Sequence, residues 1–403
     1  MIYNSNTIIL DKCYFFKYIT CLIMNTFNAH LGIRKEIREL TFSPIREIVR
    51  FAENQDEVVP FWFGEPDVST PDFISRAAKE ALDNGDTFYA PNAGIPKLRK
   101  AIADYMNDLY QTEITFEQIT VSVSAMNAIM IAAQALVQQN SKIVVLLPSW
   151  PNIPAVQKIM GARVEGIPIQ MNDGKWKLDL NQLFDTCGSD TSVIVINSPN
   201  NPSGTTCDNL KELASVAKRY KIIILSDEIY TDLSFNHKYE TISKFYPEGT
   251  CISGGLSKWC GAGGWRLGFF AVPKNLLSLF SSLKSLASES FSSVNSPTQF
   301  AAVEAYTGDY GVFIEKTTKI LKSVGSYAYN HLKSNKVLIN PPQGGFYLMP
   351  EFINKKYKDS SSLCNAILKD TGVALLPGSA FGFKKNQMLT RLSYTDFDGE
   401  KFL

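Results

Sequence analysis

Lys258 is the residue whose type and setting point most directly to chemistry. It follows Ser253-Gly254-Gly255-Leu256-Ser257 and precedes the glycine-rich run Gly261-Ala262-Gly263-Gly264. Lysine is the side chain that forms Schiff bases with carbonyl groups. Because most lysines are solvated surface charges, the hypothesis of a Schiff-base lysine depends on the groups that the rest of the chain places beside it.

Polar residues end or follow two apolar runs of the strand type. Asp227 ends the run 222–225, and Asn201 lies in the Pro- and Gly-containing turn 198–204 after the run 193–196. The carboxyl ends of parallel strands are where α/β folds place ligands. A carboxylate there could keep a pyridine nitrogen protonated, Asn201 could donate to a ligand oxygen, and Tyr230 would bring a phenol nearby. An aspartate at such a position is more often a solvated loop carboxylate, and a turn of this kind can be an ordinary βα loop.

A turn of small residues offers a place for a phosphate. Ser124-Ala125-Met126 joins a predicted strand at 119–123 to a predicted helix at 125–137. Backbone N–H groups at a helix N-terminus bind phosphate with help from the helix dipole, and Arg266 could hold the same phosphate. Many βα turns look alike, so this turn alone is weak evidence.

Trp150 and Arg391 supply two further groups. Trp150 follows the buried-strand run 142–147 and could stack on a flat cofactor ring, although core packing explains a tryptophan equally well. Arg391 could clamp a carboxylate with two parallel hydrogen bonds, although alone it is interpreted as a surface arginine. A lysine, a pyridine partner and a phosphate cradle are the parts that a pyridoxal phosphate (PLP) enzyme needs.

The elements that must position these residues alternate between strand-like and helix-like segments. This pattern predicts an α/β fold whose large domain has a mostly parallel central sheet flanked by helices. The predicted strands are 119–123, 142–147, 193–196 and 222–225, and a helix at 210–220 makes a βαβ unit. A long helical pattern at 312–333 with short strands near 337–339, 346–349 and 392–394 indicates a smaller α+β domain. We expect residues 76–310 to form the large cofactor-binding domain and 311–403 the small one, joined by the segment 30–75.

Composition excludes several other classes of protein. The 403 residues are 45% hydrophobic and 20% charged with a net charge of +1, which is typical of a soluble globular protein and gives no electrostatic reason to expect nucleic acid or membrane partners. The seven cysteines contain no C-x-x-C pair and the three histidines have no ligand-like spacing. We therefore expect no disulfide framework, no metal site and a reducing, cytoplasmic location.

The two ends of the chain give separate expectations. Residues 1–29 are predicted to be a disordered arm or a mis-assigned start, with Met24 as the natural first residue, because the apolar stretch is too interrupted for a membrane span or a signal peptide. The segment from Asp396 onward is predicted to begin a helix, whose remainder could be missing.

Several motifs in order resemble the class I/II aminotransferases of the fold-type I PLP family, of the aspartate-aminotransferase type. The resemblance covers about 42–394. The motifs that carry it are Gly64-Glu65-Pro66-Asp67 with Thr70-Pro71, Tyr89 to Arg99 (Y-x-x-x-x-G-x-x-x-L-R), Asn201-Pro202-Ser203-Gly204, Asp227-Glu228-Ile229-Tyr230, Ser257-Lys258, Gly264-Trp265-Arg266-Leu267-Gly268, Pro377 to Gly382 and Arg391-Leu392-Ser393.

The resemblance implies a role for each matching residue. Lys258 would hold PLP covalently and later move a proton, Asp227 would pair with the pyridine nitrogen, and Asn201 and Tyr230 would bond the phenolic oxygen. Trp150 would stack on the ring. The expected phosphate ligands are Ala125, Met126, Ser257 and Arg266, with Tyr89 reaching the phosphate of the neighbouring subunit in a homodimer with shared active sites. The expected substrate contacts are Gly64, Trp150, Asn201 and Arg391, the last binding the α-carboxylate.

The resemblance implies transamination between an L-amino acid and a 2-oxo acid such as 2-oxoglutarate, by a ping-pong mechanism. Aspartate or glutamate is the first expectation for the donor, and aromatic or alanine-type donors stay open. The chain departs from the family at two places. Many relatives have glycine where this chain has Ser124-Ala125 in the phosphate turn, and many have Ser or Thr where it has Gly255. The alternatives are a C–S lyase or a synthase on the same fold, and a PLP-sensing transcription regulator, for which the residues ahead of the motifs offer no DNA-binding module.

Overall fold

The computed structural model describes residues 32–40, 44–52, 57–172, 175–235, 239–353 and 356–401. The chain divides into two compact units, residues 1–41 and 42–403. The described part of the first unit holds the short helix α2 (Lys35–Arg38), with an exposed ion pair between Lys35 and Glu39. The expectation for residues 1–29 lies outside the described residues.

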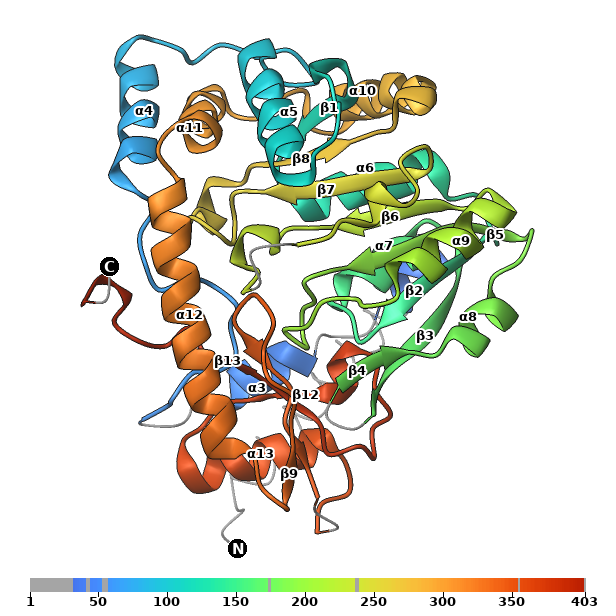
Figure 1. Cartoon of the computed structure of the whole chain (residues 1–403), viewed down its shortest axis with the longest axis vertical. Coiled ribbons are helices and arrows are strands. Elements are labelled where there is room, and N and C mark those ends of the chain that lie inside the picture. The colour runs from blue at the N-terminus through green and yellow to red at the C-terminus, as the bar shows by residue number, and fades with distance from the viewer. Residues whose placement is uncertain are drawn as a thin grey trace, which may run out of the picture. The chain divides into compact units, whose positions relative to one another are not determined.

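An eight-stranded sheet forms the centre of the second unit (Figure 1), in the order β1-β8-β7-β6-β5-β2-β3-β4. β8 is antiparallel to both of its neighbours and β4 is antiparallel to β3, while the other neighbouring pairs are parallel. The mostly parallel sheet that alternation predicted is therefore confirmed. The strands are β1 (Ile119–Ser122), β2 (Lys142–Leu147), β3 (Arg163–Asn172), β4 (Lys175–Leu178), β5 (Thr191–Asn197), β6 (Ile223–Asp227), β7 (Thr250–Gly255) and β8 (Gly268–Ala271).

Both faces of this sheet are covered, which explains why its strands are continuous apolar runs. Successive side chains of a strand point to opposite faces: Ile224 packs in a cluster with α9, whereas Leu225 packs in a cluster with α6. The helices of the two faces include α6 (Ala125–Leu136), α7 (Asn152–Ile159) and α10 (Leu277–Phe291) on one side and α8 (Leu180–Thr186) and α9 (Leu210–Tyr220) on the other. The predicted helix at 210–220 is confirmed with the same bounds.

Three further helices pack beside one end of the sheet. α4 (Asp72–Asp83) and α5 (Pro96–Tyr110) both contact α11 (Ser296–Thr307), as Figure 1 shows at the top of the molecule. The short 3-10 turns are η1 (Phe116–Gln118), η2 (Thr231–Leu233), η3 (Ile242–Lys244), η4 (Gly263–Trp265), η5 (Lys274–Leu276), η6 (Gly378–Phe381) and η7 (Gly399–Lys401). A helix was predicted to begin near Asp396, and the structure has the 3-10 turn η7 shortly after that residue.

The C-terminal third forms a separate arrangement of a long helix and short strands. α12 (Gly311–Leu332) confirms the predicted long helix, and α13 (Ser360–Thr371) follows it. The strands form one sheet of β10 (Tyr347–Leu348), β13 (Thr390–Ser393) and β12 (Leu376–Pro377), and another of β11 (Glu351–Phe352) and β9 (Val337–Leu338). The earlier helix α3 (Pro44–Ala52) contacts α13 and β12, and Val59 pairs with Val373. Residues of the segment 30–75 thus pack on these C-terminal elements.

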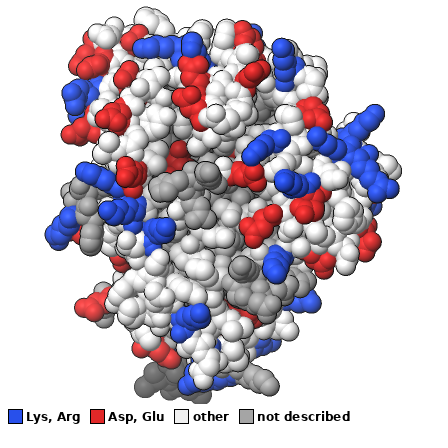
Figure 2. Space-filling view, in the orientation of Figure 1, with Lys and Arg blue, Asp and Glu red and all other residues white. Residues whose placement is uncertain are grey.

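Neither sign of charge dominates the face of the molecule that Figure 2 shows. Lys and Arg side chains are interspersed with Asp and Glu over this face of the molecule. None of the described helices is long and apolar enough to cross a membrane.

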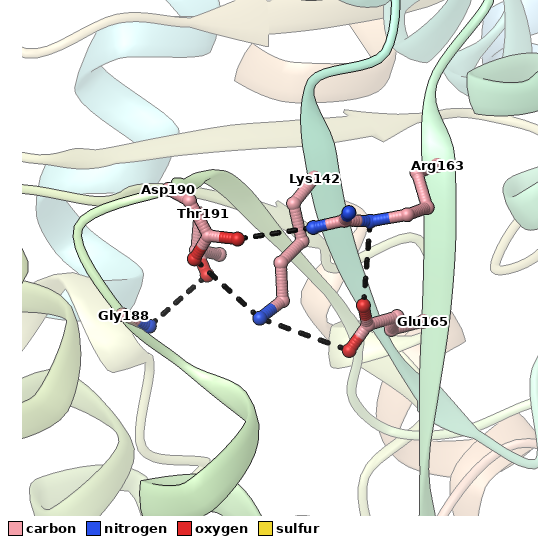
Figure 3. A network of polar contacts seen from close by, with 6 residues as sticks. All are labelled: Lys142, Arg163, Glu165, Gly188, Asp190 and Thr191. Carbon is pink, nitrogen blue, oxygen red and sulfur yellow. Dashed lines mark hydrogen bonds and ion pairs between the residues drawn. The ribbon is translucent and has the colours of Figure 1, made fainter.

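A network of ion pairs lies at the amino-terminal ends of β2, β3 and β5 (Figure 3). Lys142 lies 3.5 Å from Asp190 and 3.7 Å from Glu165, and Arg163 lies 3.0 Å and 3.5 Å from the same two carboxylates. The Lys142 side chain is 11% exposed, so its charge is stabilised by both partners. The network stands at the strand ends opposite to the predicted ligand site.

Candidate active site

A cavity of about 480 Å³ opens at the carboxyl ends of β5, β6 and β7. All of the predicted site residues except Tyr89 line it: Gly64, Ala125, Met126, Trp150, Asn201, Asp227, Tyr230, Ser257, Lys258, Arg266 and Arg391. The fold therefore brings together side chains that lie more than 300 positions apart in the sequence.

Asp227 is held by the two strands that flank its own. Asn197 at the end of β5 and Ser253 on β7 are its register partners. Ser253 Oγ donates to Asp227 Oδ1 at 3.2 Å, and Asn197 Nδ2 donates to Asp227 Oδ2 at 3.4 Å. Burial raises the pKa of Asp227 to about 6, although the hydrogen bonds from Ser253 and the Ile229 backbone and the charge of Lys258 act to lower it. A cationic ring nitrogen is the partner that would restore the charged form of this carboxylate.

Lys258 follows β7 and faces the same cavity. Its Nζ donates to the carbonyl oxygen of Gly64 at 2.7 Å and lies 5.8 Å from the centre of the Tyr230 ring. Burial, reinforced by the positive charge of Arg391, lowers the pKa of Lys258 to about 8. About a tenth of this amine is therefore neutral at pH 7, and the neutral amine is the form that attacks a carbonyl carbon.

The phosphate turn begins α6 and lies against β8. Ser124 caps the helix by accepting a hydrogen bond from the Asn127 N–H at 3.0 Å, which leaves the N–H groups of Ala125 and Met126 for a ligand. The turn approaches β8 so closely that a Cβ on Gly268 would lie 2.4 Å from the Ala125 nitrogen. Arg266 lines the cavity beside this turn, in a left-handed conformation with φ 58°.

Three polar side chains meet on one wall of the cavity. Asn201 Nδ2 donates to the hydroxyl of Tyr230 at 3.3 Å and to that of Tyr347 at 3.4 Å, and the two hydroxyls lie 2.9 Å apart. All three residues are buried. Burial raises the pKa of both phenols, so each carries its proton at neutral pH.

Arg391 is buried inside the small sheet rather than exposed, which corrects its interpretation in isolation as a surface arginine. It is 2% exposed on β13. Its Nη1 donates to Asn201 Oδ1 at 3.0 Å and its Nη2 donates to the Trp62 carbonyl oxygen. Its guanidinium carbon lies 4.7 Å, 5.0 Å and 5.8 Å from the rings of Tyr347, Phe381 and Trp150.

The Arg391 guanidinium has only neutral hydrogen-bond partners, although the residue lines the cavity. Its acceptors are an amide and a peptide oxygen, and its Nε is buried without a hydrogen-bond partner among the described residues. A buried cation left with an unpartnered N–H is costly, so a carboxylate in the cavity would supply what the site lacks. This observation agrees with the predicted substrate clamp.

Together these features fit PLP. The cavity combines a lysine of lowered pKa, a buried carboxylate at a strand end, a capped helix N-terminus beside an arginine, and a half-buried tryptophan. These are the attachment point, ring partner, phosphate cradle and stacking surface that the cofactor needs. The described residues contain no group of three or more His, Cys, Asp or Glu side chains placed to hold a metal ion.

Two residues at the site were missed at the level of sequence. Asn197 ends the run 193–196 just as Asp227 ends its own, so the same argument about strand ends could have found it. Tyr347 stands in a strand-like run of apolar residues, and nothing in its spacing distinguishes it from the core. Cys260, two residues after Lys258, is a buried thiol that donates to the Leu256 carbonyl oxygen at 3.2 Å and does not line the cavity.

Comparison with known proteins agrees with this site. The profile of the family aminotransferase class I and II matches residues 56–401. An aspartate aminotransferase of Pyrococcus horikoshii is 31% identical over 87% of this chain and 90% of its own length, and one of Geobacillus stearothermophilus is 31% identical over 90% and 94%.

Solved structures give the same result. An alanine aminotransferase from Pyrococcus furiosus superposes with a TM-score of 0.85 at 26% identity, covering 90% of this chain and 94% of that one. The Thermus thermophilus aspartate aminotransferase with maleate superposes with a TM-score of 0.83 at 26% identity, covering 91% and 96%.

A lysine, a carboxylate and a helix N-terminus around one cavity, on this sheet, define a fold-type I PLP enzyme. The chain belongs to the class I and II aminotransferases, and it is a PLP-dependent aminotransferase.

Proposed function

We propose that this cavity is the transamination site and that its residues act as follows. Lys258 holds the cofactor, Asp227 pairs with the ring nitrogen, Asn201 and Tyr230 bond the phenolic oxygen, and Trp150 stacks on the ring. The phosphate is held by Ala125, Met126, Ser257 and Arg266. The observation that carries the proposal is the convergence of these groups on one cavity, whose lining includes the buried cation Arg391 with only neutral hydrogen-bond partners.

The chain's own residues would orient the substrate and move its proton. Arg391 would bind the α-carboxylate, and its hydrogen bond to Asn201 joins it to the residue that would bond the cofactor's phenolic oxygen. Bound PLP supplies an electron sink for the charge that develops at the substrate α-carbon. Lys258 Nζ, neutral in part near pH 7 because its pKa is about 8, removes the proton from the α-carbon as a general base.

We propose aspartate or glutamate as the amino donor, with 2-oxoglutarate as an acceptor. The support comes from relatives: those from Pyrococcus horikoshii and Geobacillus stearothermophilus are aspartate aminotransferases, and the Thermus thermophilus structure holds maleate, a dicarboxylate. A panel of amino donors with 2-oxoglutarate tests this, read by the loss of cofactor absorbance in the first half-reaction. A donor with a neutral side chain that reacts at least as fast as aspartate would refute the choice of donor and leave the transaminase assignment intact.

The assignment of the lysine is tested by Lys258→Ala. We expect this variant to lose transamination while it still binds PLP non-covalently. Lys274→Ala, which removes a lysine that does not line the cavity, is the matched control and should keep full turnover. Wild-type turnover in Lys258→Ala would contradict the proposal.

We propose further that the enzyme is a cytoplasmic homodimer in which Tyr89 reaches the partner's phosphate. Tyr89 is 90% exposed and does not line the cavity of its own subunit, and its neighbour Phe88 is 84% exposed. Large exposed aromatic side chains are common at interfaces. The proposed domains are a large cofactor domain at 76–310 and a small one at 311–403 with the segment 30–75.

Mixed dimers test the sharing of residues. In a dimer of Lys258→Ala and Tyr89→Ala subunits, one site carries both changes and the other carries neither. Random mixing makes about half of the dimers hybrid, so about a quarter of wild-type activity should return when two impaired proteins are mixed and refolded. A mixture that only averages the two parents would show that Tyr89 serves its own subunit or none.

A further inference from the structure

Tyr347 contacts Asn201, Tyr230 and Arg391, which all line the cavity. It lies on β10, where it pairs with Ser393 of β13, and it is 1% exposed. We propose that Tyr347 is a positioning residue that holds Tyr230 toward the cofactor with its hydroxyl and holds Arg391 toward the substrate with its ring. This inference rests on the function proposed above.

The hydroxyl of Tyr347 shares a small set of protons with Asn201 and Tyr230. Asn201 Oδ1 accepts from Arg391, so the Asn201 amide group faces the phenols and donates one proton to each hydroxyl. One phenolic proton then lies in the 2.9 Å contact between Tyr230 and Tyr347. The other phenolic proton has no further acceptor among the described residues, and Tyr230 and Tyr347 both line the cavity. The three side chains therefore present one O–H to whatever oxygen occupies the cavity.

Without the Tyr347 hydroxyl, the direction in which the Tyr230 O–H points is no longer fixed. Tyr230 would then be free to place its proton elsewhere, because Asn201 alone does not fix which way the phenol points. Since a hydrogen bond to the cofactor's phenolic oxygen stabilises its deprotonated form, a weaker bond from Tyr230 raises the pH at which the cofactor absorbance changes.

The ring of Tyr347 packs against Arg391. The guanidinium carbon is 4.7 Å from the centre of the Tyr347 ring, the nearest of the three aromatic rings around it. A cation over an aromatic face is stabilised by the ring quadrupole, and more so when it is desolvated. The ring thus holds the guanidinium plane without using any of its N–H groups as a hydrogen-bond donor.

The space beside Tyr347 is kept by Gly64. A Cβ at position 64 would lie 1.7 Å from the Tyr347 hydroxyl oxygen, so only glycine allows the phenol to reach Tyr230. The carbonyl oxygen of the same glycine accepts from Lys258 Nζ. Tyr347 therefore contacts the polypeptide at the point where the lysine is held.

Two variants separate the hydroxyl from the ring, and a third is the control. Tyr347→Phe keeps the ring and removes the hydroxyl, whereas Tyr347→Leu removes both. Tyr394→Phe deletes another buried tyrosine hydroxyl, one that donates to the Gly345 carbonyl oxygen at 3.2 Å and does not line the cavity. The readouts are the pH midpoint of the visible cofactor absorbance in the holoenzyme, kcat and KM.

We expect Tyr347→Phe to raise the absorbance midpoint by about 0.5 to 1 pH unit and to lower kcat about 10-fold, with KM within about 3-fold of wild type, as the loss of one buried hydrogen bond implies. Tyr347→Leu should raise KM about 10-fold in addition, from the lost cation–π contact. Tyr394→Phe should leave the midpoint and KM unchanged.

An unchanged midpoint in Tyr347→Phe overturns the role of the hydroxyl, and a wild-type KM in Tyr347→Leu overturns the role of the ring. A shift of equal size in Tyr394→Phe would also overturn the proposal, because it would show a general effect of losing a buried hydroxyl. These failures differ from failure of the proposed function itself, which would appear as a wild-type protein without the Lys258-dependent visible absorbance.

Discussion

The reactivity of Lys258 in the cofactor-free protein should depend on the charge of Arg391. Burial and this guanidinium are the two largest causes that lower the pKa of Lys258 from 10.5 to about 8. At pH 7 a lysine of pKa 8 is about 10% neutral and an ordinary lysine about 0.03%, so the site makes the reactive amine about 300-fold more abundant.

The assay is the rate at which the cofactor-free protein forms its visible absorbance with PLP, measured from pH 6 to 10. Because only the neutral amine attacks the aldehyde, the rate should rise with pH and level off above about pH 8. Arg391→Met removes a neighbouring positive charge, so it should move the midpoint to higher pH and slow the reaction at pH 7. Arg391→Lys keeps the charge and should leave the midpoint near that of the wild type.

Two results would refute this reasoning. A wild-type midpoint near 10.5 would show that the amine is not desolvated in solution. A midpoint in Arg391→Met that stays at the wild-type value, with the protein folded as judged by circular dichroism, would show that the guanidinium does not act on the lysine.

Four further outcomes follow from the geometry. Arg391→Leu should raise KM for the amino acid by about 100-fold or more, through loss of charge-assisted hydrogen bonds to the carboxylate; a KM within threefold of wild type contradicts the clamp. Asp227→Asn should make the cofactor-free protein more stable at pH 7 to 8 by about 2–3 kcal/mol. The reason is that the folded state raises the pKa of this carboxyl from 3.8 to about 6, so the carboxyl stabilises the fold below pH 4 and this stabilisation is lost as the pH rises through 6. Denaturant titrations at pH 4 and pH 8 measure the difference in stability between variant and wild type, and an equal difference at both pH values would contradict the prediction. Gly268→Ala should weaken PLP binding at least about 10-fold because a Cβ 2.4 Å from the Ala125 nitrogen displaces the phosphate turn, as equilibrium dialysis can measure. Lys142→Met should lower the free energy of unfolding by about 1–3 kcal/mol without changing kcat, since it leaves two carboxylates with one cation at the end of the sheet away from the site; a change in kcat would contradict that separation.

The central sheet could be predicted from sequence because its signal is local. The runs 142–147 and 222–225 are apolar on both faces, and the helix at 210–220 has a clear periodicity, so their places in the structure differ from the predicted ones by a residue or two at most. The meeting of Asp227 and Asn201 at one cavity could be predicted because polar groups at the ends of such runs come together at one edge of a parallel sheet.

The rest of the site depends on contacts between distant segments, which leave no mark in local spacing. From its local sequence, Arg391 is interpreted as a surface residue. In the structure β13 pairs with β10 and β12, and Arg391 is buried there. Tyr347 has the pattern of a core residue, and its hydrogen bonds to Tyr230 and Asn201 join residues separated by 117 and 146 positions. Strand order and the crossing of the C-terminal elements decide these contacts, and neither can be worked out from periodicity.

The alignment of Asn197, Asp227 and Ser253 across β5, β6 and β7 has a consequence for how this protein can vary in length. Successive residues of a strand point to opposite faces, so one residue inserted or deleted within any of the three strands would turn its polar side chain to the other side of the sheet. Insertions and deletions should therefore be tolerated in the connections that precede these strands and excluded from the strands themselves. A library of single-codon insertions across residues 191–255, selected for function, would show a sharp boundary in tolerance at the beginning of each strand.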